Sequence, residues 1–248
     1  MAQGLSLVGG GPFRPPSEHA PEREPGAACA PSLVALPAPS GSTLSEIFAA
    51  SPRDGGATGF LLAHLIRALP DRQRPLLWVQ ERMAILEGGR LYPPGLGALF
   101  PDIPDLIHVE ARDARAALWA MEEGLRCAAL GAVIGELWGD PGALDFTATR
   151  RLAVAAERYG VAAFLIRLGG HANLSGARMR WRIGSAPSLP HEFDPRAPGE
   201  ATWDAELFRA RGAALGRWIA AHDRAADPVG VVAVPADRTL AAAERSIA

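Results

Sequence analysis

Short apolar runs alternate with helical patterns from Thr43 onward, and this alternation is typical of βαβ units that build a mostly parallel sheet. Five of the runs predict strands, at residues 44–48, 76–79, 106–108, 132–137 and 162–167. The stretches between them predict helices at about 58–68, 113–128 and 147–159. The pattern therefore predicts an α/β fold with a mostly parallel sheet flanked by helices.

The helix expected at 113–128 shows one apolar face. The i, i+3, i+4 recurrence that defines this face comprises Ala116, Trp119, Ala120, Glu123 and Cys127. We therefore expect Trp119 to be a core residue and not part of a binding site.

The pattern changes after Arg167, where strands follow one another without crossover helices. The segment ARMRWRI, residues 177–183, alternates as a strand does. The segment WDAELFRARGAALGRWIAAHD, residues 203–223, predicts two strands around a turn, and a single helix from Trp203 to Ala221 is the competing interpretation. Gly212 and Gly216 favour the hairpin, because glycine weakens a helix interior. The sheet is thus predicted to end in a C-terminal β-hairpin extension.

The two ends of the chain differ in composition from its middle. Residues 1–40 contain eight of the 22 prolines, with glycine, alanine and serine between them. We predict a disordered tail there, a core over residues 41–234 that includes the hairpin, and a flexible C-terminal tail over 235–248.

Composition excludes several classes of protein. No apolar run approaches the roughly 20 residues that span a bilayer, so we expect a cytoplasmic protein without a membrane association. Cys29 and Cys127 show neither disulfide nor metal-ligand spacing, so no metal site is expected. The net charge of −2 gives no global attraction to nucleic acid. All 25 basic residues are arginine, which excludes any mechanism that needs a lysine of this chain.

A glycine-rich segment joins the first predicted strand to the first predicted helix. A phosphate-binding loop of the form G-x-x-x-x-G-K-[ST] needs a lysine for the outer phosphates and a hydroxyl for Mg²⁺. In the segment from Ser51 to Thr58, Gly56 and Thr58 fit, while Ser51 and Ala57 replace the first glycine and the lysine. Arg53 is no substitute, since its planar fork does not fit where an ammonium does.

This segment, with Gly55 beside Gly56, predicts a degenerate nucleotide loop. An ordinary connection between a strand and a helix is the alternative interpretation. No serine, histidine and aspartate order, HExxH motif or paired-carboxylate motif supports another chemistry, so no catalytic residue is assigned.

The order of segments resembles the RecA family of recombinase ATPases. The segments that carry the resemblance are TLSEIFAASPRDGGATGFLLAHLI, LLWVQERMA, GAVIGELWGD and AAFLIRL. The resemblance places Glu81 where that family has a catalytic glutamate and Glu136 at or beside a magnesium-associated aspartate. It places Arg167 where the family has a nucleotide-sensing glutamine. With the lysine missing, these positions are vestigial, and a pseudo-ATPase without a cofactor is implied.

Three further motifs, LSEIFA, MRWRIGSAPS and AELFRARGAALGRW, resemble the ImuA-like branch of RecA-related proteins from damage-inducible mutagenesis cassettes. The resemblance implies a non-catalytic accessory protein of SOS-induced error-prone translesion DNA synthesis that acts as an adaptor. The implied partners are an inactive Y-family polymerase-like protein (ImuB-like) and an error-prone replicative-type polymerase, with RecA as a third candidate. The alternative is an active nucleotide-dependent ATPase or recombinase regulator that binds DNA directly.

Two segments are candidate partner-binding surfaces. Strand periodicity puts Arg178, Arg180 and Arg182 on one face, where they form either a contact surface or a solvated face with carboxylates nearby. We expect replacement of these three arginines to leave the core intact. The hairpin contributes candidates of the types enriched in interface hot spots: Trp203, Phe208, Arg209, Arg211 and Trp218. The alternative is that the hairpin completes the sheet and both tryptophans are buried.

The resemblance places the loops at 139–145 and 169–177 where RecA has its two DNA-binding loops. Both are short and lack a basic cluster, so a filament-type grip on single strands is not expected, and direct DNA binding is left open. His171 is interpreted as an ordinary loop residue.

Overall fold

The computed structural model describes residues 36–39, 41–66, 69–71, 73–100, 103–191, 193–194, 196–222 and 229–232. For residues 98–99 and 229–232 only the backbone is described. The predicted tails at 1–40 and 235–248 lie almost entirely outside this range, so the domain boundaries stay predictions. Leu36, within the first predicted tail, is buried against the core.

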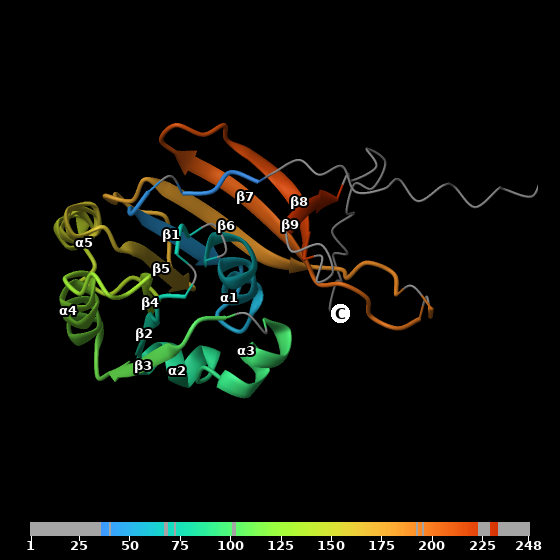
Figure 1. Cartoon of the computed structure of the whole chain (residues 1–248), viewed down its shortest axis with the longest axis horizontal. Coiled ribbons are helices and arrows are strands. Elements are labelled where there is room, and N and C mark those ends of the chain that lie inside the picture. The colour runs from blue at the N-terminus through green and yellow to red at the C-terminus, as the bar shows by residue number, and fades with distance from the viewer. Residues whose placement is uncertain are drawn as a thin grey trace, which may run out of the picture. The chain divides into compact units, whose positions relative to one another are not determined.

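In the part of the chain that the structure describes, nine strands form one sheet in the order β3-β2-β4-β5-β1-β6-β7-β8-β9 (Figure 1). The first six strands in this order are parallel, and β6 to β9 pair antiparallel. This is the predicted α/β fold, and it is consistent with a RecA-like core. The strands are β1 Leu44–Ala49, β2 Leu76–Glu81, β3 Leu106–Ala111, β4 Ala132–Trp138, β5 Ala162–Leu168, β6 Met179–Ala186, β7 Thr202–Ala210, β8 Gly216–His222 and β9 Val229–Val232.

Helices cover both faces of the parallel part of the sheet. Helix α1 (Gly56–Phe60) continues into the π-helical segment η1 (Leu61–Ile66), and these pack on one face with α2 (Arg82–Gly88) and α3 (Pro93–Leu99). Helices α4 (Ala114–Leu125) and α5 (Phe146–Tyr159) pack on the other face. The apolar residues of the strands are therefore buried in two clusters, one on each side. Helices α2 and α3 were not predicted.

Helix α4 buries a different face from the one we predicted. Trp119 is 65% exposed, so its predicted place in the core is wrong. The buried face comprises Ala114, Ala117, Leu118, Met121 and Leu125. Helix α4 packs closely against β4 in this orientation: a β-carbon at Gly135 would lie 2.1 Å from the Met121 sulfur, so a larger residue would force the Met121 side chain to shift.

The predicted C-terminal hairpin is present, and the helical alternative for this segment is wrong. Strands β7 and β8 pair antiparallel, with Trp203 opposite Ala220. Gly212 lies in the turn with a φ of 82°, a left-handed conformation that favours glycine. Trp203 is buried and packs edge to face against Phe60, so the hairpin extends the core on the α1 side of the sheet.

Candidate functional site

The predicted nucleotide loop connects β1 to α1. In this loop, the carboxylate of Asp54 accepts a hydrogen bond at the amino end of α1. Asp54 Oδ1 accepts a hydrogen bond of 2.8 Å from the Gly56 amide. Asp54 Oδ2 accepts one of 2.8 Å from the Ser185 amide, and the Ser185 hydroxyl also donates to the carboxylate. Amide groups at the start of a helix favour a negative charge, and the Asp54 carboxylate supplies that charge here.

The hydrogen bonds that Asp54 accepts favour the ionised form of its carboxylate. Burial by itself raises the pKa of Asp54, but the hydrogen bonds from Ser185 and Gly56 outweigh burial, so the pKa lies below its ordinary value. Asp54 is therefore ionised at neutral pH and acts as a fixed anion in the loop.

Gly56 is required by this arrangement. A β-carbon at Gly56 would lie 2.9 Å from Asp54 Oδ1 and 3.0 Å from the Ser185 amide nitrogen. The close backbone approach that a phosphate-binding glycine provides is thus used here by Asp54 and Ser185. Among the other predicted loop residues, Ser51 and Gly55 are exposed, Ala57 is buried and Thr58 is half-buried.

Glu136, which was predicted to occupy a vestigial magnesium position, is buried on β4. Its Oε2 accepts hydrogen bonds from Trp78 Nε1 at 3.2 Å and from Gln80 Nε2 at 3.0 Å. Burial raises the pKa of Glu136, and the two hydrogen bonds offset only part of that rise. Divalent cations bind the ionised carboxylate, so a raised pKa makes Glu136 a weaker ligand for Mg²⁺.

Glu81, which was predicted to occupy a vestigial catalytic position, also forms a hydrogen bond within the protein. Its Oε2 accepts a hydrogen bond of 3.0 Å from the Trp138 amide, which follows Glu136 by two residues on β4. A cavity of about 300 Å³ lies next to the loop and is lined by residues that include Gly55, Thr58, Gln80, Tyr92 and Glu136. The structure therefore brings the loop and Glu136 to one cavity, whose lining includes neither Glu81 nor Arg167.

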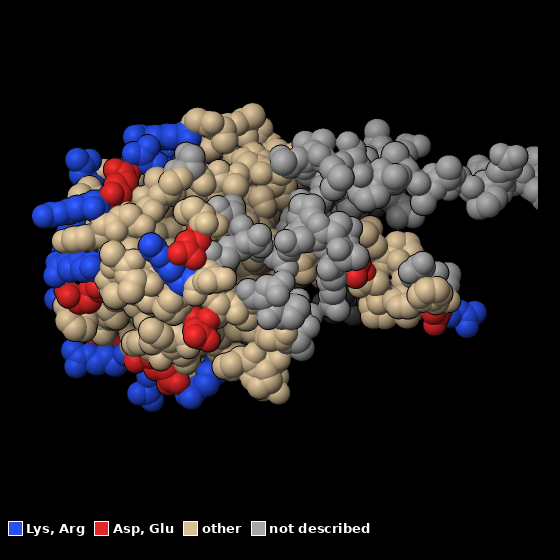
Figure 2. Space-filling view, in the orientation of Figure 1, with Lys and Arg blue, Asp and Glu red and all other residues tan. Residues whose placement is uncertain are grey.

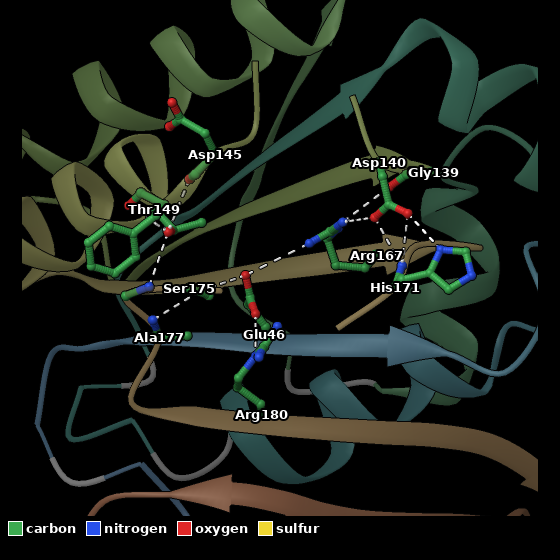
Figure 3. A network of polar contacts seen from close by, with 12 residues as sticks. Glu46, Gly139, Asp140, Asp145, Thr149, Arg167, His171, Ser175, Ala177 and Arg180 are labelled. Carbon is green, nitrogen blue, oxygen red and sulfur yellow. Dashed lines mark hydrogen bonds and ion pairs between the residues drawn. The ribbon is translucent and has the colours of Figure 1, made fainter. Parts of the chain in front are cut away.

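Arg167 connects the two loops that follow β4 and β5 (Figure 3). Its side chain is fully buried, and its NH2 group donates to Asp140 Oδ1 at 2.5 Å and to the Gly139 carbonyl at 3.2 Å. Asp140 in turn accepts from the His171 amide at 2.9 Å and lies 2.7 Å from His171 Nδ1. His171 is therefore part of a network that holds the two loops together.

Arg180 belongs to a buried ion pair, which corrects its prediction as part of an exposed arginine surface. Arg180 is 3% exposed, and its Nε donates to Glu46 Oε2 at 2.6 Å. Glu46 Oε1 accepts from the Ser175 hydroxyl at 2.9 Å and lies 4.0 Å from Arg167 NH1 (Figure 3). The cause is strand register: Glu46 of β1 is the partner of Arg180 in the parallel β1–β6 pair.

The other candidate partner-binding residues are distributed between surface and core. Arg178 pairs with Glu157 and Arg182 with Glu206, all four being partly exposed. Arg209 and Arg211 are exposed, while Phe208 and Trp218 are half-buried. Trp203 is only 4% exposed, so like Arg180 it is buried in the protein interior. Partner binding by the exposed residues stays a prediction.

Sequence reasoning missed the residues that complete the site, namely Glu46, Asp54, Gln80, Asp140 and Ser185. An acidic residue directly before Gly55 was a usable signal for Asp54, because helix amino ends favour aspartate. The partners of the others come from distant parts of the chain and leave no local signal.

The described residues offer neither a metal site nor a membrane-spanning helix. Among the residues described, no group of three or more His, Cys, Asp and Glu side chains could hold a metal ion. No helix in the described ranges has the length and apolar character needed to cross a membrane. Cys127 is an exposed free thiol, and Cys29 lies outside the described residues.

Comparison with known proteins relates this chain to curated relatives. No protein-family model matches the chain. Two proteins called Protein ImuA, from the NA1000 and CB 15 strains of Caulobacter vibrioides, are each 34% identical to it over 204 residues. The match covers 77% of this chain and 79% of each relative. At this identity and coverage, the chain belongs to the ImuA family.

Proposed function

We propose that this chain is a non-catalytic, RecA-like accessory protein of SOS-induced, error-prone translesion DNA synthesis. In this role it acts as an adaptor for an inactive Y-family polymerase-like protein and an error-prone replicative-type polymerase, with RecA as a third candidate partner. Membership of the ImuA family supports the damage-induced mutagenesis pathway. The hydrogen bonds of Asp54 in the predicted nucleotide loop support the absence of catalysis.

The position of the Asp54 carboxylate is the observation that supports a non-catalytic role. A phosphate that entered the loop would have to displace Asp54 from the Gly56 and Ser185 donors. Hydrogen bonds to charged groups contribute roughly 1.5–3 kcal/mol each, so the displacement is costly. The chain has no lysine to compensate, since all of its 25 basic residues are arginine. We therefore expect the loop to hold its own anion in place of a nucleotide.

Calorimetric titration with magnesium-ATP tests the absence of nucleotide binding. We expect no saturable heat at sub-millimolar nucleotide. The Ala57→Lys variant should behave in the same way, because Asp54 would still occupy the amino end of α1. A one-site isotherm, with ATP turnover that is lost in Glu81→Gln, would instead establish the alternative of an active ATPase.

The adaptor role needs a separate experiment. The purified chain is mixed in turn with the polymerase-like protein, with the error-prone polymerase and with RecA, each with and without magnesium-ATP, and the mixtures are analysed by size-exclusion chromatography. We expect co-elution that is the same in both conditions. A complex that forms only with ATP, or no complex with either polymerase or with RecA, would refute the nucleotide-independent adaptor.

A further inference from the structure

Four arginines lie at the edge of the sheet where the parallel strands begin. Arg178 directly precedes β6 and Arg211 directly follows β7, and the Arg211 amide donates to the Arg178 carbonyl at 3.1 Å. In the antiparallel ladder, Met179 pairs with Ala210 and Arg180 with Arg209. The start of β6 and the end of β7 therefore hold Arg178, Arg209 and Arg211 close together.

The last turn of α5 adds the fourth arginine. Arg178 lies 2.7 Å from Glu157 Oε1, and this ion pair fixes the end of α5 against the start of β6. The next residue, Arg158, is exposed and stacks over the Tyr159 ring at 5.4 Å from its centroid. We call Arg158, Arg178, Arg209 and Arg211 the amino-edge arginine cluster.

The amino-edge arginine cluster has a surplus of positive charge. Glu157 pairs with Arg178, whereas no ion pair within the described residues involves Arg158, Arg209 or Arg211. Some other exposed arginines of the described surface, such as Arg182 and Arg217, have carboxylate partners, whereas Arg82 and Arg115 have none among the described residues; the cluster differs in holding three such arginines at one edge of the sheet. Figure 2 shows basic side chains gathered on the side where α4, α5 and the β7–β8 turn lie. Arginines placed together repel one another, so the cluster favours an anion.

We propose that the amino-edge arginine cluster binds the sugar-phosphate backbone of nucleic acid. The guanidinium fork matches phosphate oxygens in a bidentate manner, and contacts to phosphates need no aromatic platform. The described part of the cluster has no exposed aromatic side chain, and Leu215 is the exposed large apolar residue of the adjacent turn. Protein interfaces usually need such apolar or aromatic anchors at their centre, so the composition favours nucleic acid over an acidic protein.

This inference goes beyond the proposed adaptor function and does not depend on it. Because the contacts are to the backbone, binding is independent of sequence and similar for single and double strands. The site differs from the filament-type loops at 139–145 and 169–177, which follow the opposite ends of the parallel strands.

Fluorescence anisotropy of the full chain with labelled oligothymidine of about 30 nucleotides, and with a duplex of equal length, tests the proposal. The test variant is Arg158→Ala with Arg209→Ala and Arg211→Ala, which keeps the Arg178–Glu157 pair. The matched control is Arg82→Ala with Arg115→Ala and Arg150→Ala, which removes the same charge from exposed arginines that also have no ion pair among the described residues and lie near the starts of α2, α4 and α5. Circular dichroism and thermal melts check that both variants fold.

We expect the test variant to bind at least about tenfold more weakly at about 50 mM salt, and its log–log salt slope for single strands to be smaller by about two. The control should bind as the parent protein does. The proposal is overturned if the parent binds neither probe at about 50 mM salt, or if both variants weaken equally. Tighter binding of poly-L-glutamate than of oligothymidine would likewise overturn it, since the cluster would then be a carboxylate-binding protein surface.

Discussion

Replacing Arg180 by methionine tests whether the arginines of β6 differ in their structural roles. In the parent protein, Arg180 Nε donates to Glu46 at 2.6 Å, and both side chains are at most 4% exposed. The variant leaves the Glu46 carboxylate buried, with the Ser175 hydroxyl at 2.9 Å and the Arg167 guanidinium 4.0 Å away. Removal of one partner of a buried ion pair typically costs about 3–5 kcal/mol.

Arg182→Met is the matched control. Arg182 lies two residues along the same strand and pairs with Glu206 at 2.8 Å, but its side chain is 53% exposed. Exposed pairs contribute about 0.2–1 kcal/mol, because water screens the charges. Urea denaturation of both variants should therefore give clearly different free energies of unfolding, with Arg180→Met the less stable.

The double variant Glu46→Gln with Arg180→Met distinguishes two costs: the loss of the ion pair, and the burial of a Glu46 charge that no longer has Arg180 as its partner. Glutamine at position 46 can still accept from the Ser175 hydroxyl but carries no charge, so the double variant should be more stable than Arg180→Met alone. Our reasoning is wrong if Arg180→Met and Arg182→Met lose the same free energy, or if adding Glu46→Gln lowers stability further.

Three other changes give distinct outcomes. Burial raises the folded-state pKa of Glu136, so above the ordinary glutamate pKa the folded state keeps a proton that the unfolded state releases, and the parent protein should lose stability as the pH rises. Glu136→Gln has no proton to release, so this loss should be absent in the variant. Urea melts across pH measure this, and equal slopes for both proteins would contradict it. Gly56→Ala should cost about 1–3 kcal/mol in urea melts because its β-carbon would meet Asp54, whereas Gly97→Ala, with open space around it, should cost nothing. Trp119→Ala should cost less than about 0.5 kcal/mol in the same melts because the ring is exposed, and a loss of several kcal/mol would restore the core interpretation.

The strands of the core were predictable because they are long apolar runs. All five predicted core strands are present, each extending one to three residues beyond its prediction. Helices α2 and α3 were missed because they have seven residues each and are flanked by glycine and proline, which predict turns. The wrong face of α4 has another cause: alanines occur on both faces, so periodicity alone did not separate the face with Met121 from the face with Trp119.

The site was predictable only where its residues are neighbours in sequence. The loop from Ser51 to Thr58 could be located by its glycines, but the Asp54–Ser185 contact spans 131 residues and depends on β6 lying beside β1. Likewise, strand periodicity placed Arg180 and Arg182 on one face, but it could not show that only Arg180 lies opposite a buried glutamate of the neighbouring strand.

The two edges of the sheet differ in how their charges are satisfied, and this difference bears on function. Ligands of open α/β sheets usually bind outside the carboxyl ends of the strands. At that edge, Asp54, Glu81 and Arg167 are all bonded to other groups of this chain. A site whose charges are already paired offers a nucleotide little new interaction energy. The amino edge instead holds Arg209 and Arg211 without ion pairs among the described residues. Three exposed arginines without such pairs, Arg158, Arg209 and Arg211, are therefore available for recognition at the amino edge, and Arg53 is an exposed arginine without one in the predicted nucleotide loop at the opposite edge.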